Sequence, residues 1–308
     1  MDLNSPIKKT TALILLVIFA WWTVRYVNHH LHEFSVITQV PLSILCILFL
    51  LFIGIIASNG ITIKYILSAF GIHIGLKEFF SLSAVSSLTN YVTIFRGGAG
   101  VRALYLKSAY KLAFSDFLST LSVMYLIHFL VNSIFGLIGM CLLNLAEVPF
   151  NRPLAALFAL LLIFSAIGVF INVRLPEFRI FPLSVISRII NNWSLVRKDR
   201  SLLLKLIANN TAYAILVVLQ TKVAFVNYDV NISWGSAMIF SAAKCLALLL
   251  TITPGSIGIV EWLSVYLGEF LGYSGSGALM AQTLMRVVSI ATLALIFPFA
   301  SRHLSRKV

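Results

Sequence analysis

The sequence predicts an all-α fold: a polytopic transmembrane helical bundle of about seven to eight membrane segments, with one or two interrupted or re-entrant half-helices. Three observations lead to this prediction. Hydrophobic residues make up 60% of the 308 residues and charged residues only 11%, uncharged apolar runs recur along the whole chain, and two of these runs are polar or broken. Because no long stretch lacks a spanning segment, we expect residues 1–308 to form a single membrane domain without a separate soluble catalytic domain.

Seven apolar runs are long enough to cross a bilayer, since a spanning helix needs about 20 residues. The first lies between Lys9 and Arg25, whose side chains we expect to snorkel to the head groups, and it lacks the small-residue cleavage site of a signal peptide. We therefore expect it to stay in the chain as the first helix. The other six candidate spans are 40–58, 117–141, 153–173, 205–225, 232–252 and 277–299.

Two further apolar segments differ from ordinary spans. Segment 79–95, FFSLSAVSSLTNYVTIF, is rich in Ser and Thr, while segment 253–272, TPGSIGIVEWLSVYLGEFLG, begins with Thr-Pro-Gly and contains two glutamates. Each is typical of half a helix, and interrupted helices at membrane depth are tolerated where they line protein or a water-filled cavity. Segment 253–272 either re-enters or crosses completely, and complete crossing gives eight crossings, which we favour.

Lysine and arginine are concentrated on one side of the predicted bundle. Lys8 and Lys9 precede the first helix, six Lys or Arg fall within 58–115, and seven fall within 174–205. The positive-inside rule therefore places the N-terminus in the cytoplasm, in a multi-pass protein of the cytoplasmic (inner) membrane. The C-terminus lies outside if 253–272 is re-entrant and inside if it crosses. Residues 175–205 mix apolar and basic side chains, which predicts an amphipathic helix on the anionic cytoplasmic leaflet.

The net charge of +13 does not indicate nucleic-acid binding, because the basic residues cluster beside apolar runs, where they set orientation and contact anionic lipid. The three cysteines lie in separate apolar runs and are expected to behave as small hydrophobic residues. The sequence HHLHE at 29–33 is interpreted as a polar interfacial turn instead of a metal site. We expect no metal, no cofactor and no nucleic-acid partner.

The stretch NYVTIFRGGAGVRALYLK, residues 90–107, places Arg96 and Arg102 on either side of a glycine-rich turn that contains Gly97 and Gly98. Glycine lets backbone N–H groups form an anion-binding concavity, and the planar fork of arginine matches a phosphate, so a phospholipid head group would fit. A second interpretation stays open: a tight turn with close helix packing, whose arginines snorkel to the interface. A dinucleotide or P-loop motif is excluded because the glycine spacing and a preceding strand are missing.

The stretch TPGSIGIVEW places Glu261 inside an apolar helix. An acid there needs a cation, hydrogen bonds or a wet cavity, and the nearest intramembrane cations are Arg286, Lys244 and the arginines of the first stretch. Glu261 and Arg286 line a polar cavity or form a purely structural ion pair, and both interpretations stay open. Lys244 is expected to snorkel to the interface.

Together these two stretches and Arg286 resemble the flippase-like membrane region of lysylphosphatidylglycerol synthases, the multiple peptide resistance factors, and their stand-alone relatives, over nearly the whole chain. The family's first motif runs approximately Asn, Pro, Arg, Gly, often an acid, and Arg, and it maps onto Asn90, Ile94, Arg96, Gly98, Ala99 and Arg102. Ile94 replaces the proline and Ala99 the acid, so no carboxylate is expected in this motif. The second motif, Pro-Gly-x-x-Gly-x-x-Glu, matches fully at Pro254, Gly255, Gly258 and Glu261.

The resemblance implies that the chain is a lipid translocator, a flippase or scramblase that moves a phospholipid or lipid-linked molecule between leaflets. In the synthases a soluble portion makes aminoacylated phosphatidylglycerol, and residues 1–308 are expected to contain no such portion. Stand-alone relatives have been linked to hopanoids and polyprenyl-linked lipids, so the expected partner is a membrane lipid, either an anionic phospholipid or a lipid of these types. The candidate substrate-binding residues are Asn90, Arg96, Gly97, Gly98, Arg102, Pro254, Gly255, Gly258, Glu261 and Arg286.

Two other functions are consistent with the sequence: a non-transporting scaffold for a lipid-synthesis enzyme, and a membrane-embedded transferase that uses lipid-linked donors. A transferase normally needs a general base or metal-binding acids. Of the ten Asp and Glu, only Glu261 and Glu269 lie near the expected cavity. We therefore expect the chain not to be an enzyme, and no nucleotide-binding motif indicates coupling to ATP.

Overall fold

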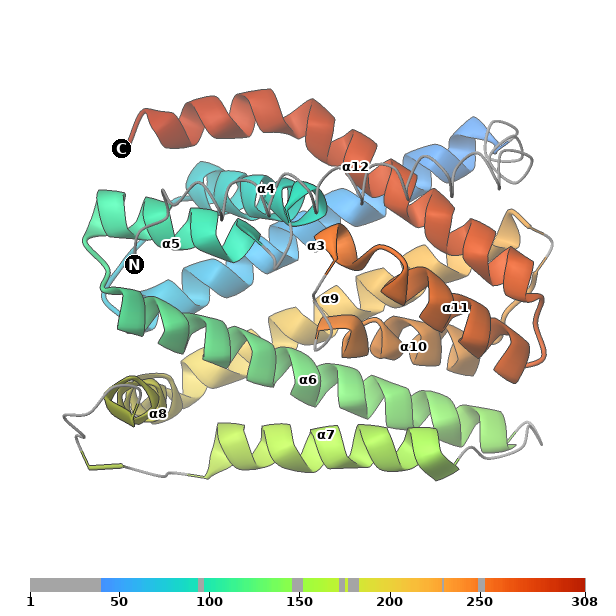
Figure 1. The fold of residues 1–308 in the computed structure, drawn as a ribbon, viewed down its shortest axis with the longest axis horizontal. Helices are drawn as coiled ribbons and strands as arrows, with labels where there is room; N and C mark the ends of the chain where they lie inside the picture. Colours follow the sequence, from blue (N-terminus) through green and yellow to red (C-terminus); the bar gives the residue numbers. More distant parts are fainter. Residues whose placement is uncertain are drawn as a thin grey trace, which may run out of the picture. The chain divides into compact units, whose positions relative to one another are not determined.

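A computed structural model of the chain describes residues 40–93, 97–145, 152–171, 175–176, 183–228, 230–248 and 253–307. The chain divides into two compact units, Met1–Leu42 and Ser43–Val308, and nearly all described residues belong to the second. These residues form helices and no strands, which confirms the all-α prediction (Figure 1). The predicted first helix and the sequence at 29–33 lie outside the described residues.

Five helices in the described part of the chain are long and apolar enough to cross a membrane. They correspond to five of the predicted spans and support a multi-pass membrane protein. The helix that matches predicted span 40–58 continues 11 residues past position 58, to Ala69. Polar groups in this extension are bonded by a neighbouring helix. Asn209 donates to Thr62 Oγ1 at 2.8 Å and to the Ser58 carbonyl at 2.9 Å. The five helices are α3 (Leu42–Ala69), α6 (Phe114–Leu145), α7 (Arg152–Phe170), α9 (Arg200–Val226) and α12 (Gly275–Ser305).

Predicted half-helix 79–95 corresponds to the first arm of a helical hairpin, α4 (Leu76–Val92) followed by α5 (Gly97–Tyr110). We call it the first hairpin. Its two outer ends are joined, because the Glu78 carboxylate at the start of α4 accepts hydrogen bonds from the Tyr105 hydroxyl at 2.6 Å and the Tyr110 hydroxyl at 2.5 Å in α5. The tip of the first hairpin is therefore the glycine-rich turn singled out by the sequence.

A second hairpin contains α10 (Trp234–Ala243), two 3-10 turns at 246–248 and 254–256, and α11 (Ile259–Phe270). Its outer ends are also joined: the Ser233 N–H, which precedes α10, donates to the Tyr273 hydroxyl beyond α11 at 3.1 Å. The run over 232–252 is not one continuous helix, since α10 ends at Ala243 and is only about 15 Å long at 1.5 Å per residue. The complete crossing expected for 253–272 is not confirmed, since α11 is only about 18 Å long. Thr253, before Pro254, is extended, as the residue before proline prefers.

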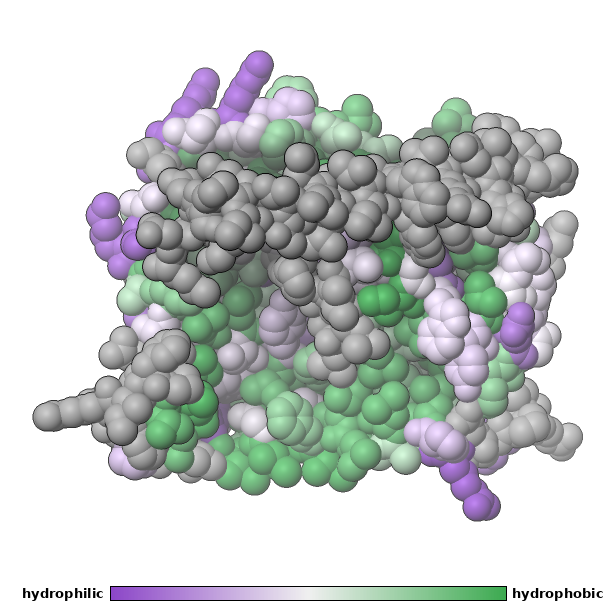
Figure 2. Space-filling view, viewed as in Figure 1, coloured by the Kyte–Doolittle hydropathy of each residue, from purple (hydrophilic) through white to green (hydrophobic). Residues whose placement is uncertain are grey.

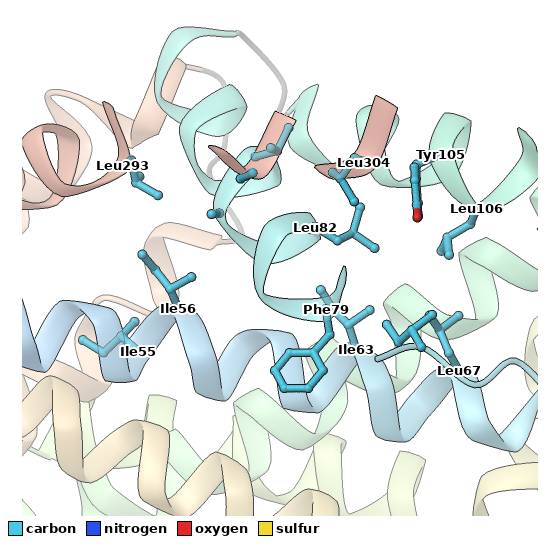
Figure 3. Close-up of a cluster of buried hydrophobic side chains, with 14 of the residues drawn as sticks. Ile55, Ile56, Ile63, Leu67, Phe79, Leu82, Tyr105, Leu106, Leu293 and Leu304 are labelled. Atoms are coloured by element: carbon cyan, nitrogen blue, oxygen red, sulfur yellow. The ribbon is translucent and has the colours of Figure 1, made fainter. Parts of the chain in front are cut away.

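The first hairpin is held by a hydrophobic cluster between α3 and α12. Figure 3 shows this cluster, with Phe79 of α4 directed toward α3 and Leu82 near Leu304 of α12. Contact with α3 is close because Gly60 has no side chain, and a Cβ there would lie 2.8 Å from the Phe79 carbonyl oxygen. The other labelled members are Ile55, Ile56, Ile63 and Leu67 of α3, Tyr105 and Leu106 of α5, and Leu293 and Leu304 of α12.

Several helix ends meet at one end of the bundle, which we call the basic end because Lys and Arg occupy the last turns of α5, α12 and α8 (Leu183–Lys198) (Figure 1, left). Lys307, just past α12, forms an ion pair with Glu78. Asn192 of α8 donates to Asp116 at the start of α6 at 2.9 Å. The C-terminal end of the described chain therefore lies on the same side as the basic segment around α8.

The exposed surface of α7 is hydrophobic along its length. Leu160, Ile163, Phe164 and Ile167 are each at least half exposed. Figure 2 shows this broad hydrophobic area in the lower part of the view, where α6 and α7 lie, with hydrophilic residues toward the helix ends. An apolar band of this kind is expected where helices face lipid hydrocarbon.

Candidate functional site

The tip of the first hairpin is shaped by close packing of α5 on α4. A Cβ at Gly98 would lie 2.0 Å from the Ser86 carbonyl oxygen, so only glycine permits this approach. The first N–H groups of α5 are capped from α4: Gly98 N–H donates to Asn90 Oδ1 at 3.0 Å, and Gly97 N–H donates to Thr93 Oγ1 at 2.9 Å. These two backbone groups are therefore used within the protein. Of the two interpretations of the glycines, the structure favours tight helix packing over an anion-binding concavity.

Arg102 lies one and a half turns into α5 and is 7% exposed, so it does not snorkel to the interface. Its Nη1 donates to Met124 Sδ of α6 at 3.4 Å. It lines a cavity of about 130 Å³, here the Arg102 cavity, whose other polar lining residues are Asn59, Ser83, Ser86, Ser87, Asn90, Tyr125, His128 and Tyr213. Arg96 and Ile94 lie outside the described residues.

The second motif forms a tight turn that leads into α11. Gly255 has a φ of +56° and Gly258 a φ of +85°, in the left-handed region that glycine adopts without strain. The Glu261 carboxylate accepts the Gly258 N–H at 2.8 Å, which satisfies one of the free donors at the start of α11 and places a negative charge beside its positive dipole end. The Pro-Gly-x-x-Gly-x-x-Glu motif therefore does two things: it starts α11 and it places a carboxylate at the first turn of that helix.

Glu261 and Arg286 form an ion pair inside the bundle. Arg286 Nη2 lies 2.6 Å from Glu261 Oε1, and the two side chains are 11% and 10% exposed, respectively. Arg286 Nη1 also donates to the Gly255 carbonyl at 2.9 Å, so one guanidinium from α12 ties together the turn and the first turn of α11. Burial of both charges is offset by this pairing and these hydrogen bonds.

The two motifs meet where the hairpin tips touch. Gly255 packs against Tyr91 of α4, and a Cβ at Gly255 would lie 2.7 Å from the Tyr91 ring. The Arg286 guanidinium lies 5.9 Å from the centre of the same ring, a cation–π contact. A second cavity of about 240 Å³, here the Gly255 cavity, opens at this junction. It shares Asn59, Ser87, Asn90 and Tyr213 with the Arg102 cavity, so the two cavities are adjacent and have a common polar wall.

Lys244 follows α10 and does not snorkel to the interface as the sequence suggested. Its Nζ donates to Thr221 Oγ1 of α9 at 3.3 Å and to Met285 Sδ of α12 at 3.4 Å, which directs the ammonium group toward the bundle interior. It interacts electrostatically with both Arg286 and Glu261. Lys244 therefore adds a basic side chain to the region of the ion pair.

Sequence reasoning missed the residues that join the two cavities. Asn59 lies inside α3 and Tyr213 inside α9, and His128 of α6 stacks edge-on against Tyr213 with ring centroids 5.2 Å apart. One signal could have found them: polar side chains inside apolar spans are rare unless they face a cavity or a partner. The sequences ASNG at 57–60 and NNTAY at 209–213 carry that signal.

Outside the cavities, Glu78 organises the basic end. Burial alone would raise the pKa of this carboxyl, but hydrogen bonds from Lys307, Tyr105 and Tyr110 outweigh burial and lower the pKa below its ordinary value of 4.5. The pKa of both tyrosines is raised, mainly by burial and next by the hydrogen bond to Glu78. Their hydroxyls therefore stay protonated and donate hydrogen bonds to the carboxylate. This network joins α4, α5 and the C-terminal end.

A search of curated proteins finds no match to this chain. The family model described as the lysylphosphatidylglycerol synthase TM region matches residues 10–296. This range contains both hairpins, the two cavities and the ion pair described above. The chain therefore belongs to the lysylphosphatidylglycerol synthase transmembrane-region family, as its motifs predicted.

Proposed function

We propose that this chain translocates a lipid with an anionic head group between the leaflets of the cytoplasmic membrane, along a polar path between the two hairpin tips. The observation that carries the proposal is the common wall of the two cavities. That wall links Arg102 on one hairpin to the Gly255 turn on the other. Family membership supports a role in lipid handling.

In this proposal both hairpins are re-entrant and enter the membrane from opposite sides. The first has its outer ends at the basic end, and the second has its outer ends joined at Ser233 and Tyr273. With the predicted first helix, five long helices then give six complete crossings and two re-entrant hairpins. Both termini lie in the cytoplasm, in agreement with the positive-inside rule. Paired interrupted helices in the two halves of a transporter are the usual position of a substrate site.

Each group has a defined role in the proposed path. Arg102 binds the phosphate as it enters from the cytoplasmic side, because its guanidinium offers a planar pair of donors. Glu261 and Arg286 keep the junction of the two tips polar, so a charged head group meets fixed charges there instead of hydrocarbon. The lipid tails stay in the bilayer.

In this proposal the hairpins move during transport, because both cavities are small. The cavities measure about 130 and 240 Å³, whereas sites that enclose small molecules measure about 300–1,000 Å³. A head group therefore passes only when the tips separate, and the contacts between Tyr91, Gly255 and Arg286 are the ones that open. Gating of this kind is common in proteins whose sites close over their substrates.

Reconstitution tests the proposal. The full chain is placed in liposomes with head-group-labelled phosphatidylglycerol, and a membrane-impermeant quencher reports how fast inner-leaflet label becomes accessible. We expect Glu261→Gln and Arg102→Lys to slow translocation at least about tenfold, since each removes a charge-assisted hydrogen bond or its bidentate geometry. The matched controls are Glu269→Gln, an exposed acid on the same helix, and Arg302→Lys, an exposed arginine, and both should transport normally.

The scaffold alternative gives a different result in the same experiment. If the chain only positions a lipid-synthesis enzyme, liposomes with and without protein lose their protected label at the same rate for every anionic lipid tried. The proposal would also be refuted if Glu261→Gln and Glu269→Gln slowed transport equally, because the buried acid would then have no special role.

A further inference from the structure

A third cavity, of about 560 Å³, lies at the basic end, where the last turn of α7, the end of α8 and the start of α9 meet. Three cations line it: Arg197, Lys198 and Arg200. The rest of its lining is apolar and comes from α7 and α9. None of its lining residues lines the Arg102 or Gly255 cavity, so it is separate from the candidate transport path.

The Arg197 guanidinium presents buried hydrogen-bond donors at this cavity. Its Nε and Nη1 are buried and have no hydrogen-bond partner among the described residues. The group lies 5.8 Å from the ring of Trp193, which is 3% exposed, so its position is fixed by stacking. Buried donors on a charged group are costly to leave unpaired, and a planar guanidinium pairs best with a carboxylate or phosphate.

Among the described residues, the acid that lies two positions after Arg197 in the sequence does not fill this role. Asp199 lies between Lys198 and Arg200, but its carboxylate caps α9 by accepting the Leu202 N–H at 3.0 Å. Its side chain is exposed. The cavity therefore presents three cations whose neighbouring carboxylate is already bonded to the backbone.

The apolar part of the cavity indicates what kind of anion fits. Phe170 and Leu204, both more than half exposed, lie at its edge. Phe170, like Leu160, is an exposed apolar residue of α7. The hydrophobic surface of this part of the chain fills the lower part of Figure 2. An acyl chain lying along α7 would place its head group at the three cations. A soluble anion would leave this apolar part unused.

We propose that this cavity binds an anionic phospholipid, with its phosphodiester on Arg197 and its acyl chains along α7. The bound lipid bridges α7, α8 and α9 and is a resident of the leaflet at the basic end, not the transported substrate. The proposal does not depend on translocation.

The test uses the full chain in detergent and the fluorescence of Trp193, isolated as the difference between the unmodified protein and Trp193→Phe. The probe is phosphatidylglycerol with brominated acyl chains, which quenches a nearby indole. We expect saturable quenching, an apparent affinity about tenfold weaker in Arg197→Gln, and no change in Lys205→Gln, an exposed cation on α9 outside the cavity. If Arg197→Gln fails to fold, the double variant Lys198→Gln with Arg200→Gln, at two exposed positions, replaces it in the experiment. Its apparent affinity for the lipid should be about tenfold weaker or more.

Three results would overturn the proposal. Brominated phosphatidylcholine that quenches as tightly as phosphatidylglycerol would show a site without charge selectivity. Equal weakening by Arg197→Gln and Lys205→Gln would show diffuse electrostatic attraction. Glycerol phosphate that displaces the lipid at comparable concentration would show a head-group site to which the acyl chains contribute nothing.

Discussion

Replacement of Gly98 by alanine tests the packing that positions the first hairpin. The new Cβ would lie 2.0 Å from the Ser86 carbonyl oxygen, whereas ordinary contact begins at 3.4 Å, so α5 must move away from α4 by up to 1.4 Å (3.4 − 2.0). Overpacking of this kind costs about 1–3 kcal/mol. The movement also stretches the hydrogen bond from Gly98 N–H to Asn90, which contributes about 0.5–1.5 kcal/mol.

Gly100 supplies the matched control, because it lies on the same helix and a Cβ there would meet nothing within 4 Å. Gly100→Ala should stabilise the protein by about 0.5–1 kcal/mol through helix propensity, while Gly98→Ala should destabilise it by a net of about 1–4 kcal/mol. Thermal unfolding of the detergent-solubilised chain measures both variants. The packing account is refuted if the two midpoints move in the same direction by similar amounts.

Three further predictions concern the ion pair, the basic end and the topology. Glu261→Ala and Arg286→Ala should each lower the free energy of unfolding by about 3–5 kcal/mol, and the double variant should recover most of it; additive losses would contradict a direct pair. Because the pKa of Glu78 is lowered on folding, its contribution to stability is present above pH 4.5 and is lost as the pH falls below it, and Glu78→Gln should flatten that part of a stability–pH profile. In a cysteine-free background, Ser274→Cys should react with an external impermeant thiol reagent and Ser201→Cys should not; the reverse pattern would invert the orientation.

The long helices were predictable from the sequence because apolar length alone defines them. Hydrocarbon thickness sets a minimum run of about 20 residues, and five predicted runs match helices that meet it. Run 232–252 was also predicted to be a span, but the structure does not contain one continuous helix there. Its composition is as apolar as that of a span, and the helix nevertheless ends at Ala243, where Lys244 turns toward α9 and α12. Tertiary contacts that stop a helix leave no composition signal.

The charged residues of the candidate site could be predicted from the sequence, but the way in which the fold brings its residues together could not. An acid and an arginine inside apolar helices predicted a pair, and Glu261 and Arg286 form one. The role of Gly98 in packing depends on which carbonyl oxygen it meets, and only the fold supplies Ser86. The common wall of the two cavities is built by side chains from α3, α4 and α9 that come together only in the fold, so single polar residues such as Asn59 could not be joined into a site from the sequence.

The balance of charge around the hairpin tips bears on which lipids fit the proposed path. Among the described residues, Arg102 and Arg286 contribute two positive charges and Glu261 one negative charge, which leaves a net charge of +1 (2 − 1). In a setting with little water this excess is only partly screened, so a head group that enters is favoured when its own charge is negative. Phosphatidylglycerol meets that condition, whereas an aminoacylated head group brings an ammonium close to two guanidinium groups. Family membership therefore does not identify a lipid, and under the proposed function the charges along the path favour an unmodified anionic head group.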